Sequence, residues 1–232
     1  MINKQYILYF ISIIILIVMS SVNVQSQDAS PLGLDNDLYN GRYYSYYLPR
    51  SVDGDQFLNS KEFTKGILWK KGAKYENILL NYDVLNQNLL LSFKTRENAD
   101  RIISISLANV DSFYLENKKF VIDTNILKYG RIYQLISYKD VKLYFYYSKN
   151  LELRSKLNEI EYQFSRLQKE IFYQNETSYI EIKNNRKLLK LLKSEIQASV
   201  KHYMKQHKYK IKRMSDKQFL DLLVFIKDKA VE

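Results

Sequence analysis

The residues Ile132-Tyr-Gln-Leu-Ile-Ser-Tyr138-Lys-Asp140-Val141-Lys-Leu-Tyr-Phe-Tyr-Tyr147 decide the fold. They form two runs rich in β-branched and aromatic side chains, which favour strands. The dipeptide Lys139-Asp140 between the runs has the length of a two-residue hairpin loop. This stretch therefore predicts two antiparallel strands, at 132–138 and 141–147, that are joined by a tight turn.

The same pattern continues towards the N-terminus. Apolar runs at 67–69, 75–84, 89–93 and 110–115 are separated by turn signals such as Asn86-Gln87-Asn88. Residues 103–107 alternate between apolar and polar, which is the period of a half-buried strand. Asparagine serves at many of the turns, because it tolerates left-handed backbone angles. Strands this short and this closely spaced predict an antiparallel meander, and no β-α-β unit is present to suggest a doubly wound nucleotide-binding fold.

The apolar period changes after residue 150. Apolar residues then recur every three or four positions, at Leu153, Leu157, Ile160, Phe164, Leu167 and Ile171. This spacing predicts an amphipathic helix over about 151–173. A short strand at 179–182 precedes a second helix, which Asn184 or Asn185 would cap and which would end near residue 206. Ser215 and Gln218 have the spacing of a capping box, so a final helix is expected after them.

These elements together predict an α+β protein. We expect an antiparallel β-meander or open sheet as its body, followed by a C-terminal helical, Lys-rich subdomain. The expected divisions are a signal peptide at 1–26, a polar leader with the first strand and turns at 27–64, the β body at 65–150 and the helical subdomain at 151–232.

The N-terminus has the features of a secretory signal peptide. Lys4 gives a small positive region, residues 6–22 are almost wholly apolar, and Val24 and Ser26 are small enough to precede a cut before Gln27. A retained single-span anchor is the alternative, because about 20 apolar residues span a bilayer as helix. We therefore expect an exported protein of the periplasm or cell surface. The absence of cysteine excludes lipid attachment through cysteine, disulfides and thiolate chemistry.

Basic residues are concentrated in one segment. The whole chain has a formal charge of +11, and residues 183–213 contain eleven Lys and Arg residues against the single acid Glu195. Such a stripe is typical of surfaces that bind polyanions. The candidate anion or partner surface comprises Lys187, Lys190, Lys193, Lys201, Lys205, Lys208, Lys210, Lys212 and Arg213. Export makes nucleic acid an improbable partner and leaves lipid headgroups, acidic glycans or an envelope protein, while a solvated helix face without a partner is the alternative.

No catalytic or metal-binding pattern is present in the sequence. His202 and His207 are five residues apart, whereas ligands on one helix need a spacing of three or four. Neither a nucleophile elbow nor a phosphate-binding glycine loop occurs. We therefore expect no catalytic, cofactor-binding or metal residues and no cofactor. A hydrolase with a carboxylate pair remains an open alternative, because such a pair is set in space and not along the chain.

The aromatic run Tyr43, Tyr44, Tyr46 and Tyr47 is a candidate binding surface. Tyrosine on the open side of a sheet can stack on sugars or peptides and donate its hydroxyl. The alternative is ordinary strand propensity with one face buried.

Residues 66–83 carry a resemblance to a known group of proteins. Gly66, a strand, Gly72-Ala-Lys-Tyr75, another strand and Tyr82-Asp83 are similar to the pattern of a family of uncharacterised exported proteins of Bacteroidetes-type bacteria. The lead-in at 52–58 and the hairpin from Val110 past Phe120 also resemble that family. The resemblance implies a fold and an exported location but no activity. We therefore expect a non-catalytic binding or accessory protein of the cell envelope, with attachment through residues 183–213 as the alternative.

Overall fold

The computed structural model describes residues 35–45, 52–95, 97–124, 126, 132–156, 159–175 and 178–231. The chain divides into two compact units after Asn36, and the second unit, residues 37–232, contains the sheets and helices described below. The expected signal peptide, and residues 27–34 and 46–51 of the expected leader, lie outside the described residues.

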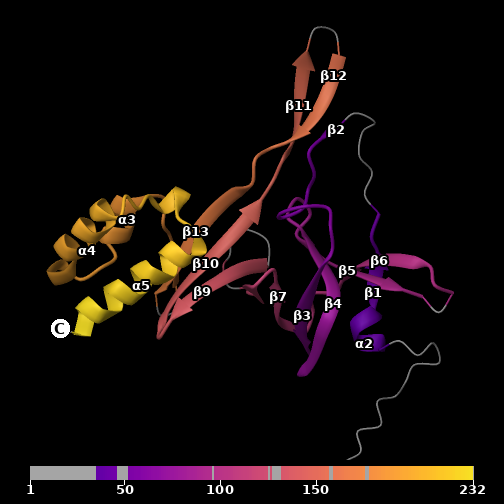
Figure 1. The fold of residues 1–232 in the computed structure, drawn as a ribbon, viewed down its shortest axis with the longest axis horizontal. Helices are drawn as coiled ribbons and strands as arrows, with labels where there is room; N and C mark the ends of the chain where they lie inside the picture. The colour runs from indigo at the N-terminus through magenta and orange to yellow at the C-terminus, as the bar shows by residue number, and fades with distance from the viewer. Residues whose placement is uncertain are drawn as a thin grey trace, which may run out of the picture. The chain divides into compact units, whose positions relative to one another are not determined.

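Most of the described chain is antiparallel sheet (Figure 1). The strands are β1 (Gly41–Tyr43), β2 (Val52–Asp53), β3 (Thr64–Lys70), β4 (Ala73–Asp83), β5 (Asn88–Lys94), β6 (Asp100–Ile105), β7 (Val110–Leu115), β8 (Lys118–Ile122), β9 (Ile132–Tyr138), β10 (Val141–Ser148), β11 (Leu151–Lys156), β12 (Glu159–Phe164), β13 (Gln168–Asn175) and β14 (Ser178–Glu181). The helices are α2 (Asn36–Tyr39), α3 (Asn185–Leu189), α4 (Ser194–Gln206), the 3₁₀ turn η1 (Ile211–Arg213) and α5 (Asp216–Val231).

Within the described residues, eleven strands form one sheet in the order β1-β6-β5-β4-β3-β7-β8-β9-β10-β13-β14. The order is that of two meanders, β3 to β6 and β7 to β10, joined where β3 pairs with β7. A second sheet contains the hairpin β11–β12 and the short β2, which pairs in parallel with β12. The predicted antiparallel sheet with a C-terminal helical part is confirmed.

Asparagines do take left-handed angles at the turns, as expected. Asn98, Asn109 and Asn117 have positive φ at the turns between strands. Asn77, with φ of 57°, is the extra residue of a bulge in β4, because Gly66 pairs with Ile78 and Ile67 with Glu76. Asparagine accepts this backbone conformation more readily than other side chains.

The prediction of a helix over 151–173 is wrong, because these residues form β11, β12 and β13. The same segment also alternates with period two, as in Tyr162 and Phe164, so its apolar residues satisfy both patterns. Pairing decides between them, since β13 lies antiparallel along β10 and buries Ile171 and Phe172 on its two faces. The helical part therefore begins at residue 185, and the expected boundary at 151 is also wrong.

One face of the large sheet carries the main core. Leu68, Tyr82, Phe113 and Phe145 are fully buried there, and the helices pack against its β9–β10–β13 end (Figure 1). A smaller cluster of Tyr133, Tyr144 and Phe172 with Ile126 is separate from this core. The tyrosines of β10 are thus mostly buried, which ordinary strand propensity explains.

The final helix is fixed to the sheet by apolar and polar contacts. The predicted capping box is confirmed, because the Gln218 side chain accepts from the Ser215 N–H at 2.9 Å and the Ser215 hydroxyl accepts from the Gln218 N–H at 3.3 Å. Phe219 is 1% exposed and meets the ring of Phe145 with centroids 4.8 Å apart. The ammonium group of Lys169 lies 5.0 Å from both ring centroids.

Candidate anion-binding surface

The basic segment folds into two helices where one was predicted. Asn184 caps α3, with its side chain accepting from the Lys187 N–H at 2.9 Å, as expected. The chain then turns at residues 190–193, and the side chain of Gln197 donates to the Leu192 carbonyl at 3.0 Å. This bond satisfies a carbonyl that the interrupted helix would otherwise leave without a partner. The two helices consequently stand as separate elements.

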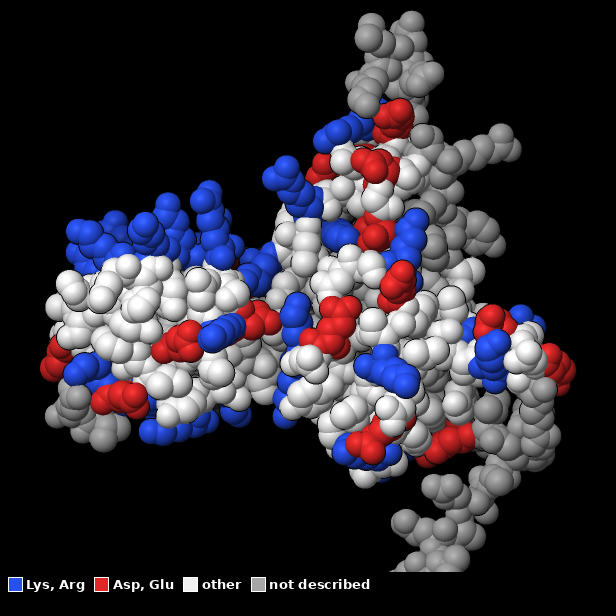
Figure 2. All heavy atoms as spheres, in the orientation of Figure 1, with Lys and Arg blue, Asp and Glu red and all other residues white. Residues whose placement is uncertain are grey.

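The buried side of both helices faces the core. Leu188 on α3 and Val200 and Met204 on α4 are at most 6% exposed and belong to the main core. The lysines occupy the remaining positions because a charged ammonium group is costly to bury. Figure 2 shows Lys and Arg side chains gathered along the margin of the helical part over α3 and α4.

All nine residues of the predicted anion surface are exposed. Within the described residues, none of the nine forms an ion pair with an acidic side chain, whereas nearby Lys183 pairs with Glu181 at 3.2 Å. A cation without a neighbouring carboxylate keeps its charge available to an external anion. We use the term basic surface for these nine residues together with Arg186.

Part of the basic surface surrounds a groove of about 1040 Å³. Its cationic side chains are Arg186, Lys190, Lys201, Lys205, Lys208 and Lys210. Its apolar lining comes from Leu189 on α3, from Ala198 and Met204 on α4, and from Tyr209 beyond α4. The groove therefore combines a cationic rim with apolar walls.

The remaining predicted residues lie elsewhere. Lys212 and Arg213 line a smaller hollow of about 580 Å³, which shares Asn185, Arg186 and Lys210 with the groove. Lys187 lies in another hollow beside Tyr179. Lys193 lines neither the groove nor these two hollows. The structure thus brings together seven of the nine predicted residues in the groove and the adjoining hollow.

Two contributors to this site were missing from the predicted set. Arg186 lines both the groove and the hollow, although its position within the basic segment was signal enough to include it. Asn185 joins the two ends of the site: its amide donates to the Tyr209 carbonyl at 2.8 Å, and its carbonyl accepts from the Ile211 N–H at 3.0 Å. No sequence signal revealed this contact, because the partners are more than twenty residues away.

The predicted aromatic surface is not assembled as expected in the part that the structure describes. Tyr43 is 76% exposed on the edge strand β1, but Tyr44 turns inward and donates to the Asp83 carboxylate at 2.6 Å. Tyr46 and Tyr47 lie outside the described residues. A tyrosine whose hydroxyl is bonded to a buried carboxylate offers little to a ligand.

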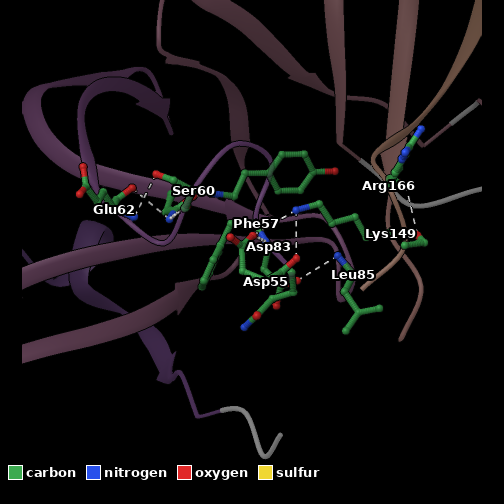
Figure 3. Close-up of polar contacts among 12 residues, drawn as sticks. Asp55, Phe57, Ser60, Glu62, Asp83, Leu85, Lys149 and Arg166 are labelled. Carbon is green, nitrogen blue, oxygen red and sulfur yellow. Dashed lines mark hydrogen bonds and ion pairs between the residues drawn. The ribbon is translucent and has the colours of Figure 1, made fainter. Parts of the chain in front are cut away.

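A second polar cluster ties the loop at 55–62 to the sheet (Figure 3). The Lys149 ammonium group lies 3.1 Å from the Asp55 carboxylate and donates to the Asp55 carbonyl at 2.9 Å. Asp83 is fully buried and accepts from the N–H groups of Leu85 and Asn86 as well as from Tyr44. Lys149 thus holds the start of the loop, and Asp83 holds the turn after β4 together with Tyr44, so these contacts serve the fold.

The two histidines lie apart from any acidic cluster. His202 is exposed, and the ring of His207 packs beside Tyr203 and Tyr209. Among the residues that the structure describes, no group of three His, Asp or Glu side chains could hold a metal ion. In the same part of the chain, no helix combines the length and the apolar character needed to cross a membrane.

Comparison of the chain with protein-family models, with curated proteins and with solved structures found no match. The resemblance of residues 66–83 to a family of exported proteins therefore stays a prediction, and the basic surface must be interpreted from its own chemistry.

Proposed function

We propose that this chain is an exported, non-catalytic binding protein of the cell envelope, and that its basic surface attaches it to an anionic lipid membrane. The observation that carries the proposal is a set of exposed cations that have no acidic partner among the described residues and that surround apolar groove walls. Export is supported by Lys4, the apolar run at 6–22 and the small residues before Gln27.

Lipid is favoured over acidic glycan for a chemical reason. Both ligands supply negative charge, but only the lipid also supplies alkyl chains that would contact the apolar groove walls. Each Lys or Arg near an anionic membrane contributes about 1 kcal/mol of binding free energy at physiological salt. Three lysines of the groove rim would therefore contribute about 3 kcal/mol, or roughly a hundredfold in affinity.

The test compares two variants of equal charge. Lys190, Lys201 and Lys205 are changed to Glu in one variant. In the other, called the sheet variant, three exposed lysines away from the groove are changed to Glu: Lys65 and Lys142 on the sheet and Lys61 in the loop before β3. The protein is purified in the form that cells accumulate, and intact mass shows whether residues 1–26 have been removed. Flotation with phosphatidylglycerol vesicles then measures membrane binding.

We expect the rim variant to lose binding at least about a hundredfold, and the sheet variant to lose much less. Binding should disappear in about 1 M salt, where the Debye length is roughly 3 Å. Equal binding by the two variants would refute attachment through the basic surface. Binding to a soluble acidic polysaccharide without binding to vesicles would assign the surface to a glycan and would also overturn the proposal.

A further inference from the structure

We infer that the groove holds the acyl part of a single anionic lipid, while the adjoining hollow holds its phosphate group. This inference rests on the proposed function and deepens it, because an electrostatic surface alone needs no groove. It predicts a site that binds one lipid molecule outside a membrane.

The groove has the size and lining of a small-molecule site. Its volume of about 1040 Å³ is at the upper end of ligand pockets, which are commonly about 300–1,000 Å³. Leu189, Ala198, Met204 and Tyr209 give it apolar walls from three successive segments of the chain. The stems of Lys201 and Lys205 extend these walls, because lysine lays its methylenes along apolar surface while its ammonium group stays in water.

The hollow has the lining of a phosphate site. Arg186, Lys210, Lys212 and Arg213 line its wall, and Arg186 and Lys210 also line the groove. Guanidinium groups bind phosphate through paired N–H donors, and lysine adds a compact positive charge. The shared residues place the cationic end of the site directly beside its apolar end, which is the arrangement of charge and alkyl chain in an anionic lipid.

Asn185 gives the site a fixed border. Both ends of its side-chain amide are occupied by backbone groups of Tyr209 and Ile211, so residues 209–211 are held against the start of α3. A border that is already ordered lowers the entropy cost of binding. Asn185 is therefore a positioning residue and not a ligand.

The apolar part of the site can be blocked without changing any charge. Ala198→Trp adds an indole to the groove wall, whereas Ser199→Trp adds the same group at the next, exposed position of α4, which does not line the groove. The probes are dihexanoyl phosphatidylglycerol below its micelle concentration, dihexanoyl phosphatidylcholine, and glycerol 3-phosphate. Isothermal titration calorimetry measures the affinity and the stoichiometry.

We expect one molecule of the phosphatidylglycerol to bind per chain, about a hundredfold more tightly than glycerol 3-phosphate, since burial of a few methylene groups gives that gain. Phosphatidylcholine should bind at least tenfold more weakly than phosphatidylglycerol. Ala198→Trp should remove the advantage of the lipid over glycerol 3-phosphate, and Ser199→Trp should retain it. Arg186→Gln should weaken the binding of phosphatidylglycerol and of glycerol 3-phosphate alike.

Three results would overturn the inference: no binding of the short-chain lipid, equal affinity for the lipid and glycerol 3-phosphate, or equal affinity of the two tryptophan variants. These results would leave the vesicle experiment unaffected, because that experiment depends on the charge of the rim. Conversely, equal vesicle binding by the two charge-reversed variants would remove the proposed function even if the groove bound the soluble lipid.

Discussion

The attachment of the helical part to the sheet can be tested at one buried hydrogen bond. Gln134 on β9 is 2% exposed, and its amide donates to the carboxylate of Asp216, the first residue of α5, at 2.8 Å. The Gln134 carbonyl accepts from the Tyr147 hydroxyl at 2.6 Å. Asp216 is thus the acceptor that completes a buried polar chain between sheet and helix.

Asp216→Ala should destabilise the protein by about 1.3–4 kcal/mol. A buried amide left without its acceptor costs roughly 1–3 kcal/mol. Loss of an acidic residue from the first turn of α5 adds about 0.3–1 kcal/mol, because a carboxylate there interacts favourably with the helix dipole. Asp216→Asn should recover much of the loss, since its side chain retains an acceptor oxygen for Gln134.

Urea denaturation followed by circular dichroism measures the free energy of unfolding. Asp228→Ala is the matched control, because Asp228 is an exposed acid near the other end of the same helix, where a change should stay within about 0.5 kcal/mol. A loss for Asp216→Ala no larger than that of Asp228→Ala would refute the reasoning. It would mean that the bond to Gln134 contributes nothing to the attachment of α5.

Two further predictions concern the same region. Phe219→Ala should lower the free energy of unfolding in urea by about 3–5 kcal/mol, because it removes a 1%-exposed ring that packs on Phe145. A loss below about 1 kcal/mol would mean that α5 does not pack on the sheet through this ring. Burial raises the pKa of Tyr147, so its contribution to stability is complete below the ordinary pKa of 10 and is lost as pH rises towards the folded-state pKa. Above pH 10 this residue should therefore lower the unfolding free energy by up to about 1.4 kcal/mol per pH unit. Tyr147→Phe should make the plot of unfolding free energy against pH less steep. An unchanged slope would contradict the burial of the Tyr147 hydroxyl.

Local signals predicted the elements that depend on neighbouring residues. The bounds of β7 and β9 match the predicted runs, and the caps at Asn184 and Ser215 form as expected. These features depend on side chains within a few positions of the backbone they contact. The prediction for 151–173 failed because its apolar residues fit a helix and a strand equally well. Strand pairing makes the choice, of β13 with β10 and of β11 with β12.

The candidate site was predictable in its charges and not in its shape. The stripe at 183–213 identified the exposed cations, since lysines beside a regular apolar pattern stay in solvent. The groove depends instead on the turn at 190–193 and on the bonds from Asn185 to Tyr209 and Ile211. Such contacts depend on where the chain returns after α4, which periodicity does not reveal.

The interruption between α3 and α4 gives the basic surface more than charge. The sequence predicted a single helix from Asn184 to residue 206. Such a helix would present its lysines along one exposed side and would bury its whole apolar side in the core. The turn at 190–193 instead separates the helices, and Gln197 satisfies the carbonyl exposed by the break. The segment at 209–211, which Asn185 holds through hydrogen bonds, then supplies a third wall of the groove. Because Leu189 and Ala198 reach the groove from two different helices, the cations surround an apolar floor, and charge and alkyl contact can act on one ligand.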